Sequence, residues 1–416
     1  MKIVYIFGAG ASASINERVP VMANFFEKAI DLLDESNKSF LLAFAFTEEA
    51  RAFPQNFEVE NLGIKMGAIE RLNEQFVNPR NNPEMTEQQS SLLNKELIEI
   101  INNYKAAFKS DSKRRMANLE DVFSKVEAYM EKKGKNTAAD QTHARLQYMI
   151  NGLFYHLDLD KDLQKSFSNA AHHTLSEFVA STDNVEHTFI SFNYDLWLEK
   201  ALYQKKLWLP RDGYGSYNFE YYSRPEEDIE CGSGNVNIAN KFTEKPQKSK
   251  VNVLKPHGSL SWRFGKNHEN GIIILENGEN SIVAYNKTWN YPPLHFPKNT
   301  EINLIPLIVP PAPNKIRSHP LFRKTDKDVS NALLHADAVV IVGWSMPLTD
   351  RYQQDIILNI LSNREEQIKK LIVCDKRESG GDLLLPKFES IFRAREIKPW
   401  LGGFNSEFVD FLKKEV

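Results

Sequence analysis

Short runs of apolar, often β-branched residues recur along the chain, and most of them end at a glycine or a polar side chain. The first run, 2–7, is continuous and ends in glycine, which is typical of a buried parallel strand that enters a tight turn. Similar runs follow at 188–192, 251–255, 304–309, 338–342 and 371–374, with a weaker one at 395–398. Helical patterns lie between most of them, at 194–203, 329–335, 350–362 and 406–414. This alternation predicts an α/β fold, with a Rossmann-like and mainly parallel sheet flanked by helices.

Two stretches interrupt the alternation. Residues 86–180 are rich in Glu, Lys, Leu, Ala and Gln, contain little Gly or Pro, and space their apolar residues as amphipathic helices do. They predict a helical insertion, whose start could lie as early as Pro20. Residues 210–250 are polar and carry many Gly, Pro, Tyr, Asn and Ser residues, which predicts an irregular insertion. The runs 272–275 and 281–285 flank an Asn-Gly pair and predict a β-hairpin.

The composition narrows the classes of function. The formal net charge of −3 at pH 7 argues against a general electrostatic grip on nucleic acid, so we expect no direct nucleic-acid binding. The two cysteines, Cys231 and Cys374, exclude a dense disulfide framework and a four-cysteine zinc site, and they suit a reducing cytoplasm. No run reaches the roughly 18 apolar residues of a membrane helix, and the N-terminal run lacks the features of a signal peptide. We therefore expect a cytoplasmic protein without a metal or a membrane segment.

The glycine-rich segment 8–13, Gly-Ala-Gly-Ala-Ser-Ala, lies between the first predicted strand and a helix. It satisfies the pattern G-x-G-x-x-A, in which glycines permit a tight turn and let backbone N–H groups approach a pyrophosphate. A strand-ending turn of small residues explains the segment nearly as well. A hydride-transferring dehydrogenase fits less well, because the acid expected about 20 residues further on would be Asp31 or Asp34, within a helical pattern.

Asn193 and His257 each follow closely on a predicted strand, and such positions face the ligand crevice of an open α/β sheet. Asn193 can hold a ribose hydroxyl or a water molecule without titrating. Asp195 can orient it, although Asp195 is equally suited to begin the next helix. His257 is the candidate general base, since an imidazole titrates near neutrality. A serine hydrolase that uses Ser12 or Ser259 fits poorly, because the chain contains no G-x-S-x-G elbow.

Two further strand ends carry residues that suit a nucleotide. Gly343 and Ser345 follow the run 338–342 and could bind a phosphate or ribose through backbone amides. A tight strand-to-helix turn explains Gly343 equally well. Asp375 ends the run 371–374, and its carboxylate could accept hydrogen bonds from ribose hydroxyls.

In residue type and chain order these motifs resemble the sirtuin family, and more specifically its bacterial branch of antiviral defence. The matching segments are Gly-Ala-Gly-x-Ser at 8–12, Asn-Leu-Glu-Asp-Val at 118–122, Ser-Phe-Asn-Tyr-Asp at 191–195, Pro-His-Gly-Ser at 256–259 with Trp262, and Gly-Trp-Ser-Met-Pro at 343–347. The resemblance extends from Lys2 to Asp375, and the two insertions carry no match. It implies a single sirtuin-like NAD-binding domain over 1–416.

The resemblance also implies roles for individual residues. Asn193 and His257 match the family's catalytic pair, which Asp195 supports. The residues that would bind NAD⁺ are Gly8, Ala9, Gly10 and Ser12 along its phosphates, Gly343, Ser345 and Asp375 on the adenosine-ribose side, and Pro20 and Gly258 elsewhere in the pocket. In this family the nicotinamide–ribose bond breaks through an oxocarbenium-like state, and the histidine acts as a base on the ribose hydroxyls.

The chain departs from the sirtuin deacetylases in three respects, the first of which is that the segments that would form an acyl-lysine peptide groove are not recognisable. It has no paired Cys-x-x-Cys motifs for their zinc module. After Ser12 it keeps only Val19-Pro20 of their Gly-Ile-Pro-Asp-Phe-Arg pattern. We therefore expect hydrolysis of NAD⁺ to ADP-ribose and nicotinamide in place of deacetylation, acting in antiphage defence by NAD⁺ depletion.

Such an activity needs a gate, because unrestrained NAD⁺ hydrolysis would kill the host. The resemblance implies a homo-oligomer and a HerA-type DNA-translocating ATPase as partner, with the helical insertion as a candidate contact surface. Two alternatives stay open. One is a non-catalytic NAD- or ADP-ribose-sensing or assembly subunit of a defence complex. The other is a different hydrolase, such as a nuclease with a partner, which the lack of a clustered acidic metal motif disfavours.

Overall fold

The computed structural model describes most of the chain outside a few long segments. The described residues are 1–25, 28, 119–133, 143, 147, 150–151, 153–154, 157–158, 160–210, 212–217, 219–223, 237–238, 249–265, 271–275, 302–303, 307–309, 319–347, 350–376 and 381–416. The chain divides into two compact units. The first comprises 1–21, 158–288 and 300–416, and the second comprises 22–157 and 289–299.

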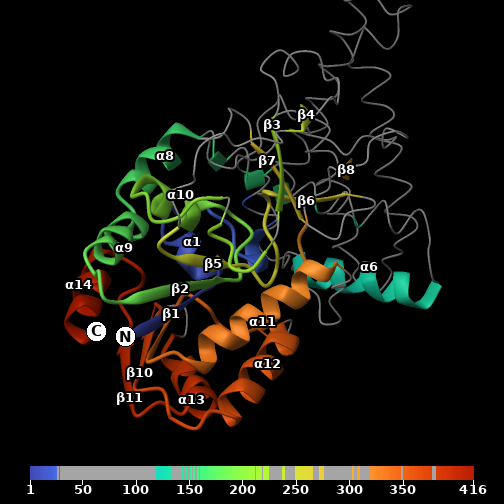
Figure 1. Cartoon of the computed structure of the whole chain (residues 1–416). Coiled ribbons are helices and arrows are strands. Elements are labelled where there is room, and N and C mark those ends of the chain that lie inside the picture. The colour runs from blue at the N-terminus through green and yellow to red at the C-terminus, as the bar shows by residue number, and fades with distance from the viewer. Residues whose placement is uncertain are drawn as a thin grey trace, which may run out of the picture. The chain divides into compact units, whose positions relative to one another are not determined.

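Six parallel strands form the central sheet of the first unit (Figure 1). In chain order they are β1 (Lys2–Phe7), β2 (Glu186–Ser191), β5 (Asn252–Leu254), β9 (Ala338–Val342), β10 (Lys370–Cys374) and β11 (Glu396–Trp400). They lie in the order β11-β10-β9-β1-β2-β5, with parallel pairing throughout. The sheet therefore grows outward from β1 in both directions, which is the doubly wound Rossmann arrangement, and its switch point lies between β1 and β9. The predicted α/β fold is confirmed.

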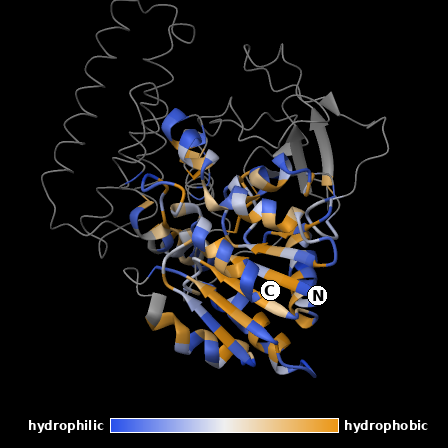
Figure 2. Ribbon diagram, turned by 90° about the vertical axis from the view of Figure 1, so that its left-hand side faces the viewer, coloured by the Kyte–Doolittle hydropathy of each residue, from blue (hydrophilic) through white to orange (hydrophobic). Residues whose placement is uncertain are grey.

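Helices cover both faces of this sheet, because successive side chains of a strand point to opposite faces. On β1, Ile3, Tyr5 and Phe7 belong to one apolar layer, and Val4 and Ile6 belong to the other. The first layer also takes side chains from α1 (Ala9–Ala13), α9 (Ala171–Ala180), α10 (Trp197–Gln204) and α14 (Ser406–Glu415). The second takes them from α11 (Pro320–Leu334), α12 (Arg351–Ser362) and α13 (Gly381–Phe392). In Figure 2 the strands of this sheet are coloured mainly as hydrophobic.

A second sheet in the same unit has the order β4-β3-β7-β6-β8. Its strands are β3 (Phe219–Ser223), β4 (Asn237–Ile238), β6 (Trp262–Gly265), β7 (Gly271–Leu275) and β8 (Ile302–Asn303). The predicted strand 272–275 is thus β7, which pairs with β3 and β6. Its predicted hairpin partner, 281–285, lies outside the described residues. The segment 210–250, predicted as irregular, contains the strands β3 and β4.

The apolar run 304–309 was predicted as a strand of the parallel sheet, and for the described part of the run this prediction was wrong. Its described residues, 307–309, pair antiparallel with the segment after β5 through a bridge between Gly258 and Ile308. The N–H of Leu307 donates to the carbonyl of Trp262 at 2.7 Å. An apolar run indicates that a segment is buried, and it does not determine which strand the segment pairs with.

The described part of the second unit is helical. It includes the short helix η1 (Met22–Asn24) and α6 (Leu119–Lys133). The unit spans 22–157 in its main segment, whereas the sequence predicted a helical insertion over 86–180. The unit begins at Met22, close to Pro20, the earliest start considered for the insertion. At the other end the bounds differ because α8 (Lys161–Ser168) and α9 belong to the first unit, where Leu175 of α9 packs in the layer over the sheet.

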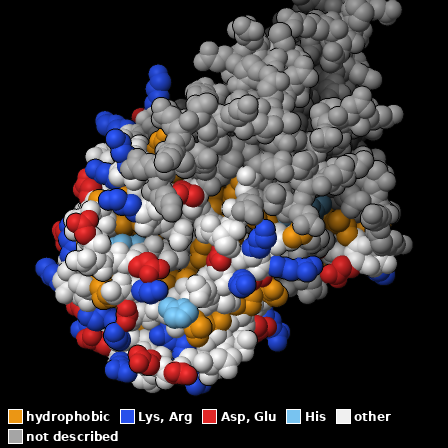
Figure 3. All heavy atoms as spheres, in the orientation of Figure 1, with side chains coloured by type: hydrophobic (Ala, Val, Ile, Leu, Met, Phe, Trp, Pro, Cys, Tyr) orange, Lys and Arg blue, Asp and Glu red, His pale blue; other side chains and the backbone are white. Residues whose placement is uncertain are grey.

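None of the helices in the described ranges combines the length and the apolar character of a membrane-spanning segment. On the face that Figure 3 draws, Lys and Arg side chains are interspersed with Asp and Glu side chains over the described surface.

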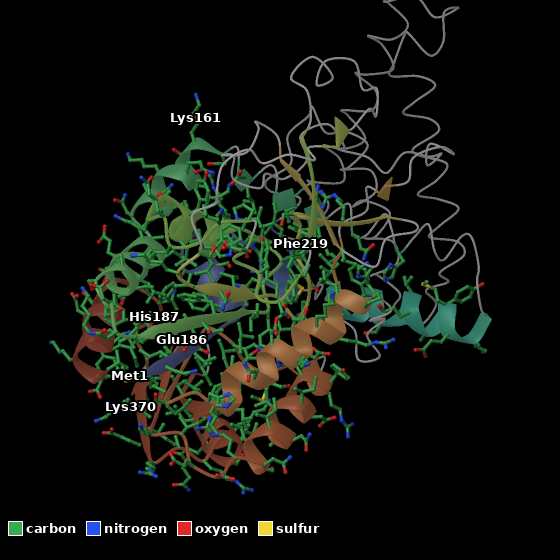
Figure 4. The ribbon with its side chains drawn as sticks, in the orientation of Figure 1. Met1, Lys161, Glu186, His187, Phe219 and Lys370 are labelled. Carbon is green, nitrogen blue, oxygen red and sulfur yellow. The ribbon has the colours of Figure 1, made fainter. Side chains whose placement is uncertain are left out.

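Two buried histidines link the stability of the first unit to pH. His187 lies near the amino end of β2 (Figure 4), with the Tyr5 hydroxyl 3.0 Å from Nδ1 and the Thr182 hydroxyl 2.7 Å from Nε2. Burial lowers the pKa of His187 to about 4. Burial, with a smaller contribution from the adjacent histidine, lowers the pKa of His172 on α9 to about 3. Both pKa values lie below the value of about 6.5 for an unfolded histidine, so the folded state favours the neutral imidazoles.

The contribution of these two histidines to the free energy of unfolding is therefore expected to have its full value above pH 6.5. It should fall as the pH drops below 6.5. Between about pH 6 and pH 4 each of the two histidines adds a slope of about 1.4 kcal/mol per pH unit. Urea unfolding of wild type and His187→Gln at pH 7, 6 and 5 measures this slope, which the variant should reduce. His335→Gln is the control because His335 is exposed. Equal slopes for wild type and His187→Gln would contradict the assignment.

Candidate functional site

The carboxyl ends of the parallel strands meet at one edge of the sheet, and predicted site residues follow five of the six strands. The positions are Gly8 after β1, Asn193 after β2, His257 after β5, Gly343 after β9 and Asp375 after β10. Phe7 pairs in register with both Ser191 and Val342, so the turns after β1, β2 and β9 leave the sheet at the same level. This edge includes the switch point between β1 and β9, where open α/β sheets bind their ligands.

The side-chain amide of Asn193 is fixed by two hydrogen bonds. Its Nδ2 donates to the Gly8 carbonyl at 2.9 Å and to the Ser12 Oγ at 2.8 Å. An Asn side chain has two amide hydrogens, so both are used. The opposite orientation of the amide would place its oxygen against the Gly8 carbonyl oxygen. Oδ1 of this half-buried side chain is therefore the atom that can accept a hydrogen bond from a ligand.

Ser12 connects Asn193 to a buried carboxylate. The Ser12 hydroxyl, which accepts from Asn193, donates to Asp195 Oδ2 at 2.7 Å. Burial raises the pKa of Asp195, while nearby Lys255 and the hydrogen bonds from Ser12 and Trp197 oppose this shift. Asp195 can therefore orient Asn193 indirectly, because it accepts the hydrogen bond of the Ser12 hydroxyl, and Ser12 in turn accepts a hydrogen bond from Asn193.

His257 lies beside Asp350, a carboxylate that is not among the predicted site residues. Its Nε2 is 3.2 Å from Asp350 Oδ1, and the two side chains are only 6% and 5% exposed. The other oxygen of Asp350, Oδ2, accepts the indole N–H of Trp344 at 3.1 Å. The Phe192 ring packs edge-on against the imidazole, with centroids 5.0 Å apart. Since a carboxylate only accepts, a hydrogen bond from His257 to Asp350 requires the proton on Nε2.

Nothing in the sequence distinguishes Asp350 from an ordinary residue at a helix start. It precedes α12 and follows Gly-Trp-Ser-Met-Pro, so it looks like an ordinary helix N-cap. In the structure its side chain makes no capping hydrogen bond. Both of its oxygens instead have partners from other positions, His257 and Trp344.

The glycines of the β1 and β9 turns pack directly against one another. A Cβ on Gly8 would lie 2.5 Å from the Trp344 Cα, and a Cβ on Gly343 would lie 2.4 Å from the Ala11 nitrogen. Gly343 also has a φ of +58°, which favours glycine. The N–H groups of Gly8 and Gly10 donate to the carbonyls of Val342 and Gly343. Contact between protein segments is therefore a sufficient reason for these glycines, and those two N–H groups already have partners.

The other predicted binding residues differ in exposure. Gly10 and Ser345 are exposed, Ala9 is half-buried and Pro20 is buried. Gly258 has a φ of +77°, and a Cβ there would lie 2.1 Å from the Leu307 carbonyl oxygen, so packing of 307–309 requires glycine.

Asp375 is half-buried, and burial raises its pKa. A hydrogen bond from the backbone of the next residue lowers the pKa by a smaller amount. Its Oδ1 accepts the N–H of Lys376 at 2.7 Å. Asp375 follows β10, and the glycine-rich turn follows β1. Because β9 lies between these two strands, Asp375 is two strands away from the glycine-rich turn. Within the described ranges, no group of three or more His, Cys, Asp and Glu side chains gathers as metal ligands would.

No protein-family model matches the chain, and no curated protein matches it.

Proposed function

We propose that the chain binds NAD⁺ at the carboxyl edge of the β1–β2–β5–β9 strands and hydrolyses it to ADP-ribose and nicotinamide. One observation carries this proposal. Asn193 and His257 follow the adjacent strands β2 and β5 at the edge that contains the switch point, each held by hydrogen bonds or a carboxylate. An oriented amide oxygen and a histidine–carboxylate pair at the same edge of the sheet provide one group that positions a hydroxyl or water and one that accepts a proton.

The reaction consumes one water and releases one proton. The bond between C1′ of the ribose and the nicotinamide nitrogen breaks, and its electron pair leaves with nicotinamide. Water then forms a new C–O bond at C1′. Asn193 Oδ1 accepts a hydrogen bond from the ribose or the attacking water, and the imidazole of His257 accepts the proton. Asp350 stabilises the imidazolium that results.

The remaining assignments extend the same proposal. The pyrophosphate would lie against the turn of Gly8, Ala9, Gly10 and Ser12, and the adenosine ribose beside Gly343, Ser345 and Asp375. Exposure of Gly10 and Ser345 supports a position for these two residues at the ligand, whereas Gly8 and Ser12 are buried. A role in antiphage defence, gating by oligomerisation and a HerA-type ATPase partner stay predictions from the sequence resemblance.

Product analysis tests the proposed reaction. Purified wild type, alone and with a co-purified ATPase partner and DNA, should convert NAD⁺ to nicotinamide and ADP-ribose, which chromatography separates. Asn193→Ala should turn over NAD⁺ about 10²-fold more slowly, the scale of loss when a reactant is mispositioned by about 1 Å. Asn363→Ala, at an exposed asparagine after α12, should keep the wild-type rate. Binding of NAD⁺ or ADP-ribose without turnover in every condition would reject hydrolysis and favour a sensing or assembly subunit.

A further inference from the structure

A buried ion pair lies beneath the Asn193 loop. Lys255, directly after β5, places its Nζ 2.7 Å from Glu199 Oε1 on α10. The lysine side chain is 0% exposed and the glutamate side chain 1% exposed. The same Nζ donates to the backbone carbonyl of Asp195 at 2.6 Å. The pair therefore joins three segments, namely the end of β5, the helix α10 and the loop that carries Asn193.

Stability alone is a weak reason for such a pair. Two charges taken out of water lose their hydration, and well-packed apolar residues of similar volume are often as stabilising. A buried ion pair nevertheless has strict geometry, because a displaced partner leaves an unpaired charge in a poorly hydrated interior. The position of the Lys255 ammonium group is therefore well defined. Because this group donates to the Asp195 carbonyl, it also restrains the backbone of that residue.

The loop is constrained from two directions. Its backbone is held by Lys255, and its side chains are held by the chain of hydrogen bonds from Asn193 to Ser12 to Asp195. The glutamate has support of its own, since the Tyr214 hydroxyl lies 3.4 Å from Glu199 Oε1. These contacts leave the Asn193 amide little freedom to turn.

We propose that Lys255 and Glu199 are positioning residues that hold the 193–195 loop so that Asn193 Oδ1 faces the substrate. This inference rests on the proposed hydrolysis for its kinetic test. The loop geometry can be tested without any turnover.

The test uses the neutral double variant Lys255→Met/Glu199→Gln, which removes both charges together. We expect kcat for NAD⁺ to fall about 10- to 100-fold, with KM within about 2-fold of wild type, because the loop affects a group that acts on the reacting bond. In an Asn193→Ala background the same double change should cost nothing further, since residues that act through Asn193 are not additive with its loss. Lys369→Met/Asp337→Asn is the control. This exposed pair lies at the amino ends of β9 and β10.

Hydrogen exchange of the free protein gives the second readout. In the double variant, amides in 191–198 should exchange at least about 10-fold faster than in wild type, while those of β9 and β10 stay unchanged. A uniform increase along the chain, unchanged exchange at 191–198, or a wild-type kcat would overturn the proposal. If wild type itself does not hydrolyse NAD⁺, the proposed function fails and the exchange result alone decides the positioning role.

Discussion

His257→Ala is expected to lower NAD⁺ turnover by about 10²–10⁴-fold, the usual contribution of a general base. The loss should appear in kcat and in kcat/KM alike, because proton transfer belongs to the transition state and not to ground-state binding. Steady-state kinetics with chromatographic detection of nicotinamide measures it. Since His257 is buried, His257→Gln serves as a second variant that keeps most of the side-chain volume and a donor for Asp350. Both variants should show the same large loss.

Asp350→Asn tests the carboxylate partner in the same assay. It removes the negative charge that faces His257 Nε2 while it keeps the shape of the side chain. We expect a smaller loss of about 10- to 100-fold, the scale known for carboxylates that orient metal-ligating histidines, and no further loss when it is combined with His257→Gln. His335→Ala, at an exposed histidine, should leave turnover unchanged. A folded His257→Ala protein with wild-type turnover would exclude His257 as the base.

The strands of the parallel sheet could be predicted from the sequence because their signal is local. Runs such as Lys2–Phe7 and Ala338–Val342 are continuous, apolar and bounded by glycine, and both are buried strands. The order of the strands is not local. β1 pairs with β2 across a separation that includes 22–157, the main segment of the second unit, and no periodicity in either strand specifies that partner. The prediction for the run 304–309 was wrong for the same reason, because the pairing of its described residues depends on the segment around Gly258.

The candidate site could be predicted only as far as strand ends mark it. Asn193 and His257 were identified because each follows closely on an apolar run, and the structure places both at the carboxyl edge. Asp350 was missed because an Asp before a helix normally caps it. The glycines illustrate a different limit. A glycine permits close approach of any backbone, and the sequence cannot tell a phosphate from the Trp344 backbone that lies against Gly8.

The partner of Lys255 likewise could not be predicted from the sequence. The burial of Lys255 leads to the second prediction with a large expected effect, a loss of stability. A lysine after a strand is normally exposed, whereas Lys255 is completely buried against Glu199. Lys255→Met leaves the Glu199 carboxylate buried without its cation, so the free energy of unfolding at pH 7 should fall by about 3–5 kcal/mol. A typical domain has about 5–15 kcal/mol in total, so this loss is large. Urea unfolding followed by circular dichroism measures it.

The double variant Lys255→Met/Glu199→Gln should recover most of that stability, because it removes the stranded charge as well as its partner. Lys369→Met is the matched control, since its pair with Asp337 is largely exposed and such pairs contribute at most about 1 kcal/mol. If the double variant were as unstable as Lys255→Met, the cost would come from the lost hydrogen bond to the Asp195 carbonyl and not from an unpaired charge. Recovery of stability without recovery of turnover would instead separate the two roles of the pair, because the protein would fold well and yet hold Asn193 loosely.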